Sequence, residues 1–385
     1  MESRDTYRTF FLPGVPALCL SAAFFATTAG VSAETVRALR PKFTSTMTVA
    51  GCTNGQSIAL ANFPVPVRIS TAKIPGFCYG TCDGADDISF SDESGSILPH
   101  EVEVWNTEGE SVAWVSVPQV YTNSVFYMNW SHRRKLATAH SGDVWTNSTA
   151  NYKGVWHFAD DFDESAGQSD STGNGFKASY VSNIAKSGIG DTSSIGKAFY
   201  RTLDANTAAA CFNTPNLTST MKMNWNGVTL SGWAYYKGYG ATGQQHLLWI
   251  STSSSGSYYW GINTQNKTLR SKFGTATAET IGTGLNPASG WFHWALRVTN
   301  QTTYEYFLNG VLLKTLTKDS KYSTQSTTSQ WTCGGTTGYL DEYRYRNVAS
   351  SEDWVKAEYD SIKNKDFVIA SDAVKNDGGF IIVVQ

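Results

Sequence analysis

The chain has 385 residues, a formal net charge of −2 and only 16% charged residues, whereas aromatic residues make up 13%. Lysine and arginine do not gather into a stripe, so the sequence lacks the basic surface with which proteins hold nucleic-acid phosphates. The length accommodates two domains. No sustained 3.6-residue apolar period occurs, and glycine is frequent (34 residues), which favours short strands and turns over helices. We therefore predict an all-β protein with no nucleic-acid partner.

The N-terminus has the pattern of an export signal. Arg4 and Arg8 precede an apolar stretch over residues 10–25, and a run of small residues ends in Val31-Ser32-Ala33, an A-x-A-like cleavage site. The apolar stretch is short and is broken by proline and glycine, so it makes a poor membrane span. We predict that residues 1–33 are a signal peptide. The mature protein would be secreted or displayed at the cell surface, with no membrane span left after cleavage; a retained N-terminal anchor is the alternative.

Cysteine usage fits export. One of the six cysteines lies in the predicted signal peptide, and the odd number that remains leaves at least one thiol unpaired or paired between chains. We expect Cys78 and Cys82 to form a local disulfide, and Cys211 and Cys333 to form one across the second domain. Zinc is the competing explanation, but it takes about four nitrogen or sulfur ligands and no histidine lies near Cys78 and Cys82.

The first domain is predicted over residues 43–131, where apolar and polar residues alternate around turn residues. In one predicted strand, Val102 and Val104 would face one side of a sheet while Glu101 and Glu103 face the other. A second predicted strand, over residues 57–69, contains two prolines and is therefore expected at a sheet edge or a bulge.

This segment resembles a family of uncharacterised bacterial domains, the domain-of-unknown-function family 2341. The matching landmarks occur in the order 62–68, 84–90, 98–106, 114–118 and 127–130. The last one departs from the family pattern, because Asn129-Trp130-Ser131-His132 stands where the family usually has Tyr-Trp-Gly-Asn. The resemblance implies a β-sandwich and transfers no chemistry. Polar residues 132–150 are predicted to be a linker.

The second domain is predicted over residues 154–363. It resembles the laminin-G/concanavalin-A-like jelly roll, on landmarks at 154–158, 170–175, 195–198, 230–234, 290–295, 306–311 and 338–344. Asn309-Gly310 predicts a two-residue hairpin, and Ser350 or Ser351 is expected to cap a helix over residues 352–363. Residues 364–385 read as a C-terminal strand extension that pairs with a domain or with another chain.

We expect no catalytic residues and no enzyme activity. Glycanases share the predicted jelly roll, and retaining hydrolysis needs two carboxylates about 5–5.5 Å apart, but the Glu-x-Asp-x-x-Glu strand motif of the glucanase relatives is absent. No Gly-x-Ser-x-Gly elbow and no His-Glu-x-x-His motif occur either. His157 and His293 lie on predicted strands, where a packed role is expected. A glycoside hydrolase is the least favoured of the alternatives.

A structural calcium ion is the one cofactor that we predict. The loop Asp170-Ser-Thr-Gly-Asn174-Gly offers side-chain oxygens on a backbone that glycine lets bend. Relatives of the resembled family often hold calcium there, with help from the region of Asp341. The predicted ligands are therefore Asp170, Asn174 and Asp341, and the alternative is an Asx-turn with no ion.

Aromatic residues are the predicted ligand-binding groups of the second domain. Strand alternation puts Trp233 and Tyr235 on one face, and Tyr239, Tyr258 and Tyr259 lie at predicted loop tips or hairpin ends, where they would bind sugar. We predict a non-catalytic adhesion protein that binds a carbohydrate or cell-surface glycan, and that also contacts other surface proteins. The alternative is a structural component of an envelope or extracellular layer, which should expose edge strands or an apolar patch in place of an aromatic site.

Overall fold

The computed structural model describes residues 42–51, 59–131, 142–161, 163, 165–180, 187–190, 193–201, 212–216, 219–236, 244–251, 258–263, 268–273, 277–283, 290–319, 330–334 and 338–376. The predicted signal peptide, Cys52, Cys211 and Tyr239 lie outside these residues. Within them the protein is built from antiparallel sheets and a few short helices, which confirms the predicted all-β class. No described helix has the length and apolar character needed to cross a membrane.

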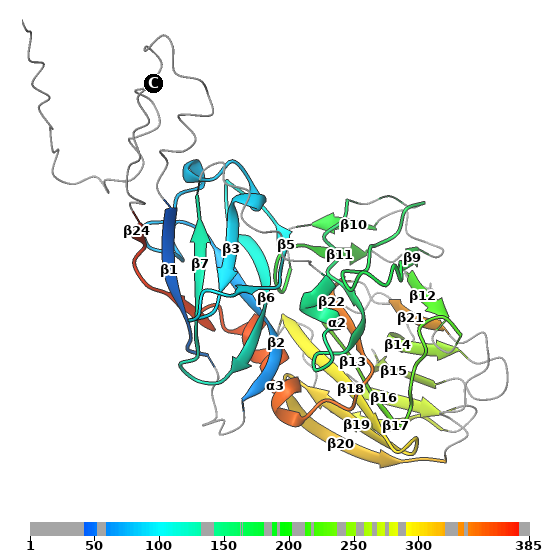
Figure 1. Cartoon of the computed structure of the whole chain (residues 1–385). Helices are drawn as coiled ribbons and strands as arrows, with labels where there is room; N and C mark the ends of the chain where they lie inside the picture. Colours follow the sequence, from blue (N-terminus) through cyan, green and yellow to red (C-terminus); the bar gives the residue numbers. More distant parts are fainter. Residues whose placement is uncertain are drawn as a thin grey trace, which may run out of the picture.

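The first β-sandwich consists of a six-stranded and a three-stranded sheet (Figure 1). Its strands are β1 (Lys42–Val49), β2 (Leu60–Ile69), β3 (Ile88–Ser91), β4 (Ile97–Leu98), β5 (His100–Val104), β6 (Ser111–Val120), β7 (Val125–Trp130), β23 (Val368–Ala370) and β24 (Val374–Asn376), and the 3-10 turns η1 (Tyr79–Thr81) and η2 (Ala85–Asp87) accompany them. One sheet has the order β23-β1-β7-β3-β4, with β24 also paired to β1, and the other has the order β2-β6-β5.

The prolines of β2 explain its place at a sheet edge. Pro64 and Pro66 stand opposite Ser116 and Trp114 of β6, and no other strand of the sheet pairs with β2. Proline has no N–H to donate, so an edge strand tolerates it where a central strand does not. This confirms the predicted edge position.

The second β-sandwich places an eight-stranded sheet against a seven-stranded one. Its strands are β8 (Tyr152–Trp156), β9 (Ser179–Tyr180), β10 (Ser187–Gly190), β11 (Ala198–Arg201), β12 (Phe212–Asn216), β13 (Gly227–Tyr236), β14 (Gln244–Ser251), β15 (Tyr258–Asn263), β16 (Thr268–Phe273), β17 (Glu279–Gly282), β18 (Trp291–Thr299), β19 (Thr303–Leu308), β20 (Val311–Thr317), β21 (Gln330–Gly334) and β22 (Gly338–Arg346). The first sheet has the order β10-β11-β22-β13-β18-β19-β20, with β8 on β22, and the second has the order β17-β16-β15-β14-β21-β12-β9.

Two local signals in this half are confirmed. Asn309 and Gly310 join β19 to β20 with φ values of 48° and 76°, the positive values that a two-residue hairpin turn requires. Helix α3 (Glu352–Lys363) begins after Ser351, whose Oγ accepts a hydrogen bond from the Trp354 backbone N–H at 3.1 Å. Between the sheets, the rings of Trp260 and Trp294 meet edge to face with centroids 5.3 Å apart, at the centre of the core of this sandwich.

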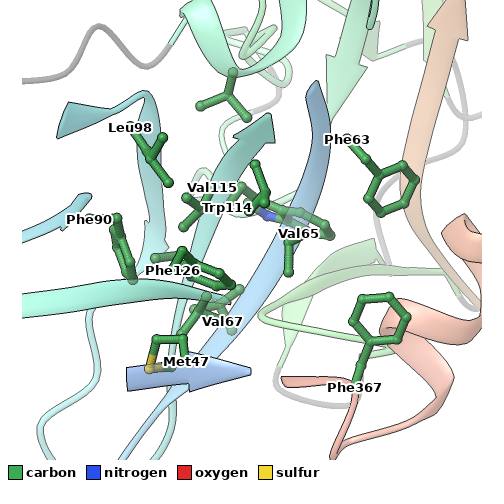
Figure 2. Packing of buried hydrophobic residues seen from close by; sticks show 14 of the residues in the cluster. Met47, Phe63, Val65, Val67, Phe90, Leu98, Trp114, Val115, Phe126 and Phe367 are labelled. Atoms are coloured by element: carbon green, nitrogen blue, oxygen red, sulfur yellow. The ribbon is translucent and has the colours of Figure 1, made fainter. Parts of the chain in front are cut away.

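A second core cluster joins the two sandwiches. It contains the inward residues of the first sandwich, some of which are drawn in Figure 2, together with Trp145, Tyr152, Trp233 and Trp354 from the second half. Trp145 belongs to helix α2 (Gly142–Thr146), which the sequence analysis placed in a linker and which is packed between the sandwiches with Trp145 fully buried. The outer face of the eight-stranded sheet is therefore largely an internal surface.

The C-terminal segment returns to the first sandwich. Both β23 and β24 pair antiparallel with β1, at Met47 opposite Ala370 and Phe43 opposite Lys375 (Figure 1). Between α3 and β23, Phe367 is buried, and its carbonyl accepts hydrogen bonds from the N–H groups of Ala50 and Gly51. The end of the chain thus completes a sheet that its beginning started. The remainder of the predicted extension, residues 377–385, lies outside the described part of the chain.

Replacing Phe367 tests how much this return contributes to stability. Phe367→Ala should lower the free energy of unfolding by about 3–5 kcal/mol, because it empties a ring-sized volume beneath β1. Ile369→Ala is the matched control on the same segment, since Ile369 is 52% exposed, and it should cost less than about 1 kcal/mol. Urea unfolding of both variants measures the difference, and equal effects would show that the segment is only loosely attached.

Candidate functional site

The outer face of the eight-stranded sheet carries the aromatic residues of interest. Along β13, Leu230 and Ala234 point into the core of the second sandwich, whereas Trp233 joins the cluster between the sandwiches. Tyr235, two residues beyond Trp233, lies on the same outer face. The predicted placement of Trp233 and Tyr235 on one face is confirmed.

Four aromatic side chains form a row across this face, one from each of four neighbouring strands. Tyr200 of β11 stands opposite Tyr339 of β22, Tyr339 stands opposite Tyr235 of β13, and Tyr235 stands opposite Trp291 of β18. Successive ring centroids are 6.2, 5.7 and 5.9 Å apart. We call Tyr200, Tyr339, Tyr235 and Trp291 the aromatic row. Three strand spacings of about 4.8 Å give the row a length of roughly 14 Å.

The aromatic row is partly accessible to solvent. Tyr200 is 37% exposed, and the other three side chains are intermediate between buried and exposed. Tyr200 lies over Gly188 of β10, where an added Cβ would come within 2.8 Å of the Tyr200 hydroxyl oxygen. Glycine at this edge position therefore leaves room for the ring. The result is a cluster of large apolar rings with polar hydroxyls at the margin of an otherwise covered sheet face.

The aromatic row does not include the tyrosines that were predicted to bind sugar. Tyr258 and Tyr259 begin β15 and pair with β14 and β16 in the other sheet of the sandwich, and their side chains lie outside the described part of the structure. Tyr239 is outside it as well. Binding by these three tyrosines stays a prediction. The row itself depends on the register of four strands, which a single sequence does not reveal.

The predicted calcium loop is held by its own hydrogen bonds. Asp170 accepts four of them, from the backbone N–H groups of Val155, Thr172 and Phe176 and from the Thr172 hydroxyl, at 2.6–3.3 Å. The Asn174 amide donates to the same hydroxyl at 2.8 Å. These contacts form the Asx-turn that was the alternative to an ion, and calcium at the loop stays a prediction.

Asp341, the third predicted calcium ligand, is hydrogen-bonded to a different segment of the chain. Its carboxylate is fully buried and accepts hydrogen bonds from the Ser194 N–H and hydroxyl and from the Ile195 N–H. The pKa of Asp341 is raised well above its ordinary value, mainly by burial and to a smaller extent by repulsion from the neighbouring Glu342 and Glu103. A buried carboxyl of this kind is better suited to holding the 193–195 segment in place than to an exposed loop site.

The predicted disulfides remain untested. Cys78 and Cys82 flank η1 and are thiols in this structure, and burial, with repulsion from Asp87 adding to it, raises the pKa of Cys82 to about 12. Cys333 lies on β21 opposite Phe212, the residue that follows Cys211. Cys211 lies outside the described residues, so a Cys211–Cys333 bond stays a prediction.

A cluster of charged side chains is buried where the two sandwiches meet. Glu101 and Glu103 of β5 come from the first sandwich, and each carboxylate accepts a hydrogen bond from an indole N–H. Trp145 donates to Glu101 at 2.6 Å, and Trp114 of β6 donates to Glu103 at 2.8 Å. The face of β5 that was predicted to be polar is therefore polar, but it is turned toward the second sandwich.

The second sandwich contributes His157, Glu342 and Arg344 to this cluster. His157 Nδ1 lies 2.5 Å from Glu342 Oε1, and the Arg344 guanidinium donates to Glu342 Oε2 at 2.5 and 3.1 Å. The His157 ring is stacked on Trp114, with centroids 5.5 Å apart, and the guanidinium lies 4.6 Å from the centre of the same indole ring. Two cations are thus held between carboxylates and an aromatic face. We call Glu101, Glu103, His157, Glu342 and Arg344 the junction cluster.

The backbone at Glu342 is unusual. Its φ is 53° in the middle of β22, beside a register shift in the pairing with β13 between Ser231 and Trp233. A non-glycine residue in this region costs of order 1–3 kcal/mol and persists where the surroundings require it. Here the bulge turns Glu342 onto the outer face next to Asp341, so that two successive carboxyl groups reach the junction.

Burial and neighbouring charges set the protonation states in the junction cluster. Burial raises the pKa of Glu103 to about 7, against the attraction of His157 and with added repulsion from Glu342. Burial opposes ionisation of Glu342 too, but the cations of His157 and Arg344 outweigh it and lower that pKa. Although burial alone would lower the pKa of His157, Glu342 and Glu101 raise it well above its ordinary value. With Glu103 protonated, two carboxylates balance two cations.

The donor atoms of Glu103, His157 and Glu342 lie within 4.8 Å of one another, which is close enough to consider a metal ion. Metal–ligand bonds of about 2.0–2.2 Å place neighbouring donors roughly 3 Å apart. The 2.5 Å between His157 Nδ1 and Glu342 Oε1 is instead the length of a strong hydrogen bond. Arg344 also supplies a positive charge at Glu342. The residues present therefore fit a hydrogen-bonded ion cluster better than a metal centre.

Comparison with known proteins gives no family for the chain. No protein-family model matches it, and no curated protein matches it in sequence. Among solved structures, the binding domain of Paraclostridial Mosquitocidal Protein 1 is 13% identical with a TM-score of 0.40, over 56% of this chain and 53% of that one. The binding domain of botulinum neurotoxin serotype G is 11% identical with a TM-score of 0.39, over 54% and 50%.

A third similar structure is domain 4 of AbnA, a GH43 extracellular arabinanase from Geobacillus stearothermophilus, in complex with arabinotriose. It is 18% identical with a TM-score of 0.40, over 54% of this chain and 97% of that domain. The chain spans about half the length of the two toxin domains. The three likenesses are partial and distant.

The fit between Gly196 and Glu103 gives a test of the junction. Gly196 has φ +57°, and a Cβ there would overlap the Glu103 carboxylate. Gly173→Ala is the matched control, because Gly173 also has positive φ (+76°) but has open space around it. The control should cost about 1–2 kcal/mol of unfolding free energy. Gly196→Ala should cost about 1–3 kcal/mol more, because it displaces a buried hydrogen-bonded carboxyl. Chemical unfolding compares the two, and equal costs would contradict the packing described.

Proposed function

We propose that the protein is a non-catalytic, carbohydrate-binding protein of the cell surface, and that the aromatic row of the second sandwich is its binding site. The observation that supports this is the alignment of four partly exposed aromatic rings across four strands. The apolar face of a sugar ring stacks on such rings, while hydroxyls at their edges hydrogen-bond the sugar. A neutral glycan is the ligand class that this surface suits, because none of the four row residues carries a charge.

The carboxyl groups of the junction support a non-catalytic role. Glu103, Asp341 and Glu342 have no exposed side-chain surface or nearly none. Glycoside hydrolysis requires a pair of carboxyl groups on either side of a bound substrate. These carboxyl groups do not meet that requirement, because they are enclosed between the two sandwiches.

Export belongs to the same proposal. The N-terminal pattern and the cysteine spacing suit a protein that is secreted or held at the cell surface, where glycans are met. Calcium at the Asp170 loop, the two disulfides and contacts with other surface proteins are further parts of the proposal, and each can be measured on the purified mature chain.

A structural role in an extracellular layer is the second candidate, and one observation favours it. Strands β23 and β24 lie at the edge of the six-stranded sheet, and Ile369 and Val374 on them are 52% and 61% exposed. An exposed edge with apolar side chains can pair with another chain. The two candidates concern opposite parts of the molecule, so they can be tested separately.

The test of the leading proposal is a glycan-array screen of residues 34–385, with calcium and with chelator, followed by titration calorimetry. Tyr200→Ala and Tyr339→Ala should each weaken binding about tenfold or more, which corresponds to about 1.4 kcal/mol. Tyr121→Ala is the matched control, because Tyr121 is a 43% exposed tyrosine on the first sandwich, and it should bind like the parent protein.

Two results would count against the proposal. A blank array from folded protein would favour the structural role, which sedimentation of an Ile369→Lys, Val374→Lys variant can then examine. Binding that is unchanged in both row variants but lost in Tyr258→Ala or Tyr259→Ala would move the site to the seven-stranded sheet.

A further inference from the structure

We propose that the junction cluster is a proton-dependent latch, which holds the two sandwiches together most tightly while Glu103 carries a proton and loosens when that proton is lost. This inference goes beyond sugar binding and does not depend on it. It rests on which sandwich supplies each charge, and on one buried carboxyl group, Glu103, for which the described residues offer no cation of its own.

The first sandwich brings only acids to the junction, and the second brings both cations. Glu103 Oε2 lies 3.8 Å from His157 Nδ1, but that nitrogen already lies 2.5 Å from Glu342 Oε1. The second cation, Arg344, donates to Glu342 as well. Glu101 Oε2 lies 3.5 Å from the other imidazole nitrogen. Both positive charges are therefore engaged, and a charge on Glu103 would be a third carboxylate facing two cations.

Glu103 has room for a proton, but the one cation near it among the described residues, His157, is bound more closely by Glu342. Its side chain has no exposed surface. Its Oε2 accepts the Trp114 N–H, and its Oε1 has no hydrogen-bond partner among the residues that the structure describes. A neutral carboxyl group tolerates such a place far better than an ionised one, because an unpaired buried charge is among the most costly groups in a protein.

The remaining groups around Glu103 do not supply the missing charge. Asp341 of β22 is another buried acid, held by the backbone of Ser194 and Ile195. Lys197, which follows that segment, lies 3.8 Å from the exposed Asp161 instead. On the far side of Arg344, Glu358 of α3 accepts the Tyr152 hydroxyl and is 3.8 Å from His293 of β18. Burial, and to a smaller extent repulsion from the nearby Arg344, lowers the pKa of His293 to about 3, so the imidazole is neutral.

The sign of the pH dependence follows from proton counts. The pKa of Glu103 is about 7 in the docked protein, whereas the ordinary value for a glutamic acid is 4.5. Between those values the docked protein holds a proton that the separated chain has lost, so its stability falls as the pH rises through this window. The raised pKa of Asp341 acts in the same direction, and so does the raised pKa of His157 at higher pH. The lowered pKa values of Glu342 and His293 act in the opposite direction, on the acidic side.

Glu103→Gln isolates this effect, because glutamine has the shape of a protonated glutamic acid and does not ionise. Thermal unfolding of the mature chain should give similar midpoints for variant and parent near pH 5. Near pH 8 the variant should unfold about 3 °C higher, since it avoids the uncompensated charge. Glu108→Gln, at an exposed glutamate in the turn between β5 and β6, is the matched control and should follow the parent at both pH values. An offset between Glu103→Gln and parent that is the same at both pH values would overturn the proposal.

Hydrogen exchange of the unaltered protein gives a second measurement that does not require the variant to fold. After correction for the intrinsic pH dependence, protection of β5 and β6 should fall at least severalfold from pH 5 to pH 8. Protection of β16, in the sheet away from the junction, should stay constant. Unchanged protection in β5 and β6 relative to β16 would overturn the latch even if the thermal midpoints shifted.

Discussion

The burial of the outer face of the eight-stranded sheet is the constraint on which the rest of this structure depends. In an isolated sandwich that face would meet water, and its strands would simply alternate between core and polar residues. Here α2, α3 and the first sandwich cover most of it, so Trp233, Trp145 and Trp354 pack into one cluster with the core of the first sandwich. The two sandwiches are therefore joined by a common apolar core in addition to the covalent chain.

Because that face is covered, its polar side chains need hydrogen-bond or ion-pair partners inside the protein. Arg346 shows how this is met: its guanidinium donates to the carbonyls of Ala150 and Thr149 and lies 3.6 Å from the centre of the Trp354 ring. Arg344 meets the same need with Glu342 and Trp114. Glu103 is the member for which the pairing is incomplete. Because both nearby cations are bound by other carboxylates, ionisation of Glu103 destabilises the junction, and this makes the junction pH-dependent.

Much of the architecture was predictable because it is encoded locally. The prolines of β2, the Asn309-Gly310 turn and the Ser351 cap each act within a few residues, and each was found where the sequence placed it. The surfaces on which the two proposals rest were not predictable, because they depend on pairings between distant segments. Glu103 and Glu342 come from different sandwiches, and Tyr200 and Trp291 are brought together only by the register of β11, β22, β13 and β18.

The position of the aromatic row follows from the same burial. Trp291 packs against the cluster between the sandwiches, while Tyr200, at the other end of the row, is 37% exposed. One end of the row therefore lies against the cluster between the sandwiches, and the other end is open to solvent. An isolated second sandwich would expose Trp233 and its neighbours along with the row, and would present a broad apolar face prone to association. The packing between the sandwiches thus limits the accessible aromatic surface to a narrow margin, and this gives the first sandwich a definite physical role.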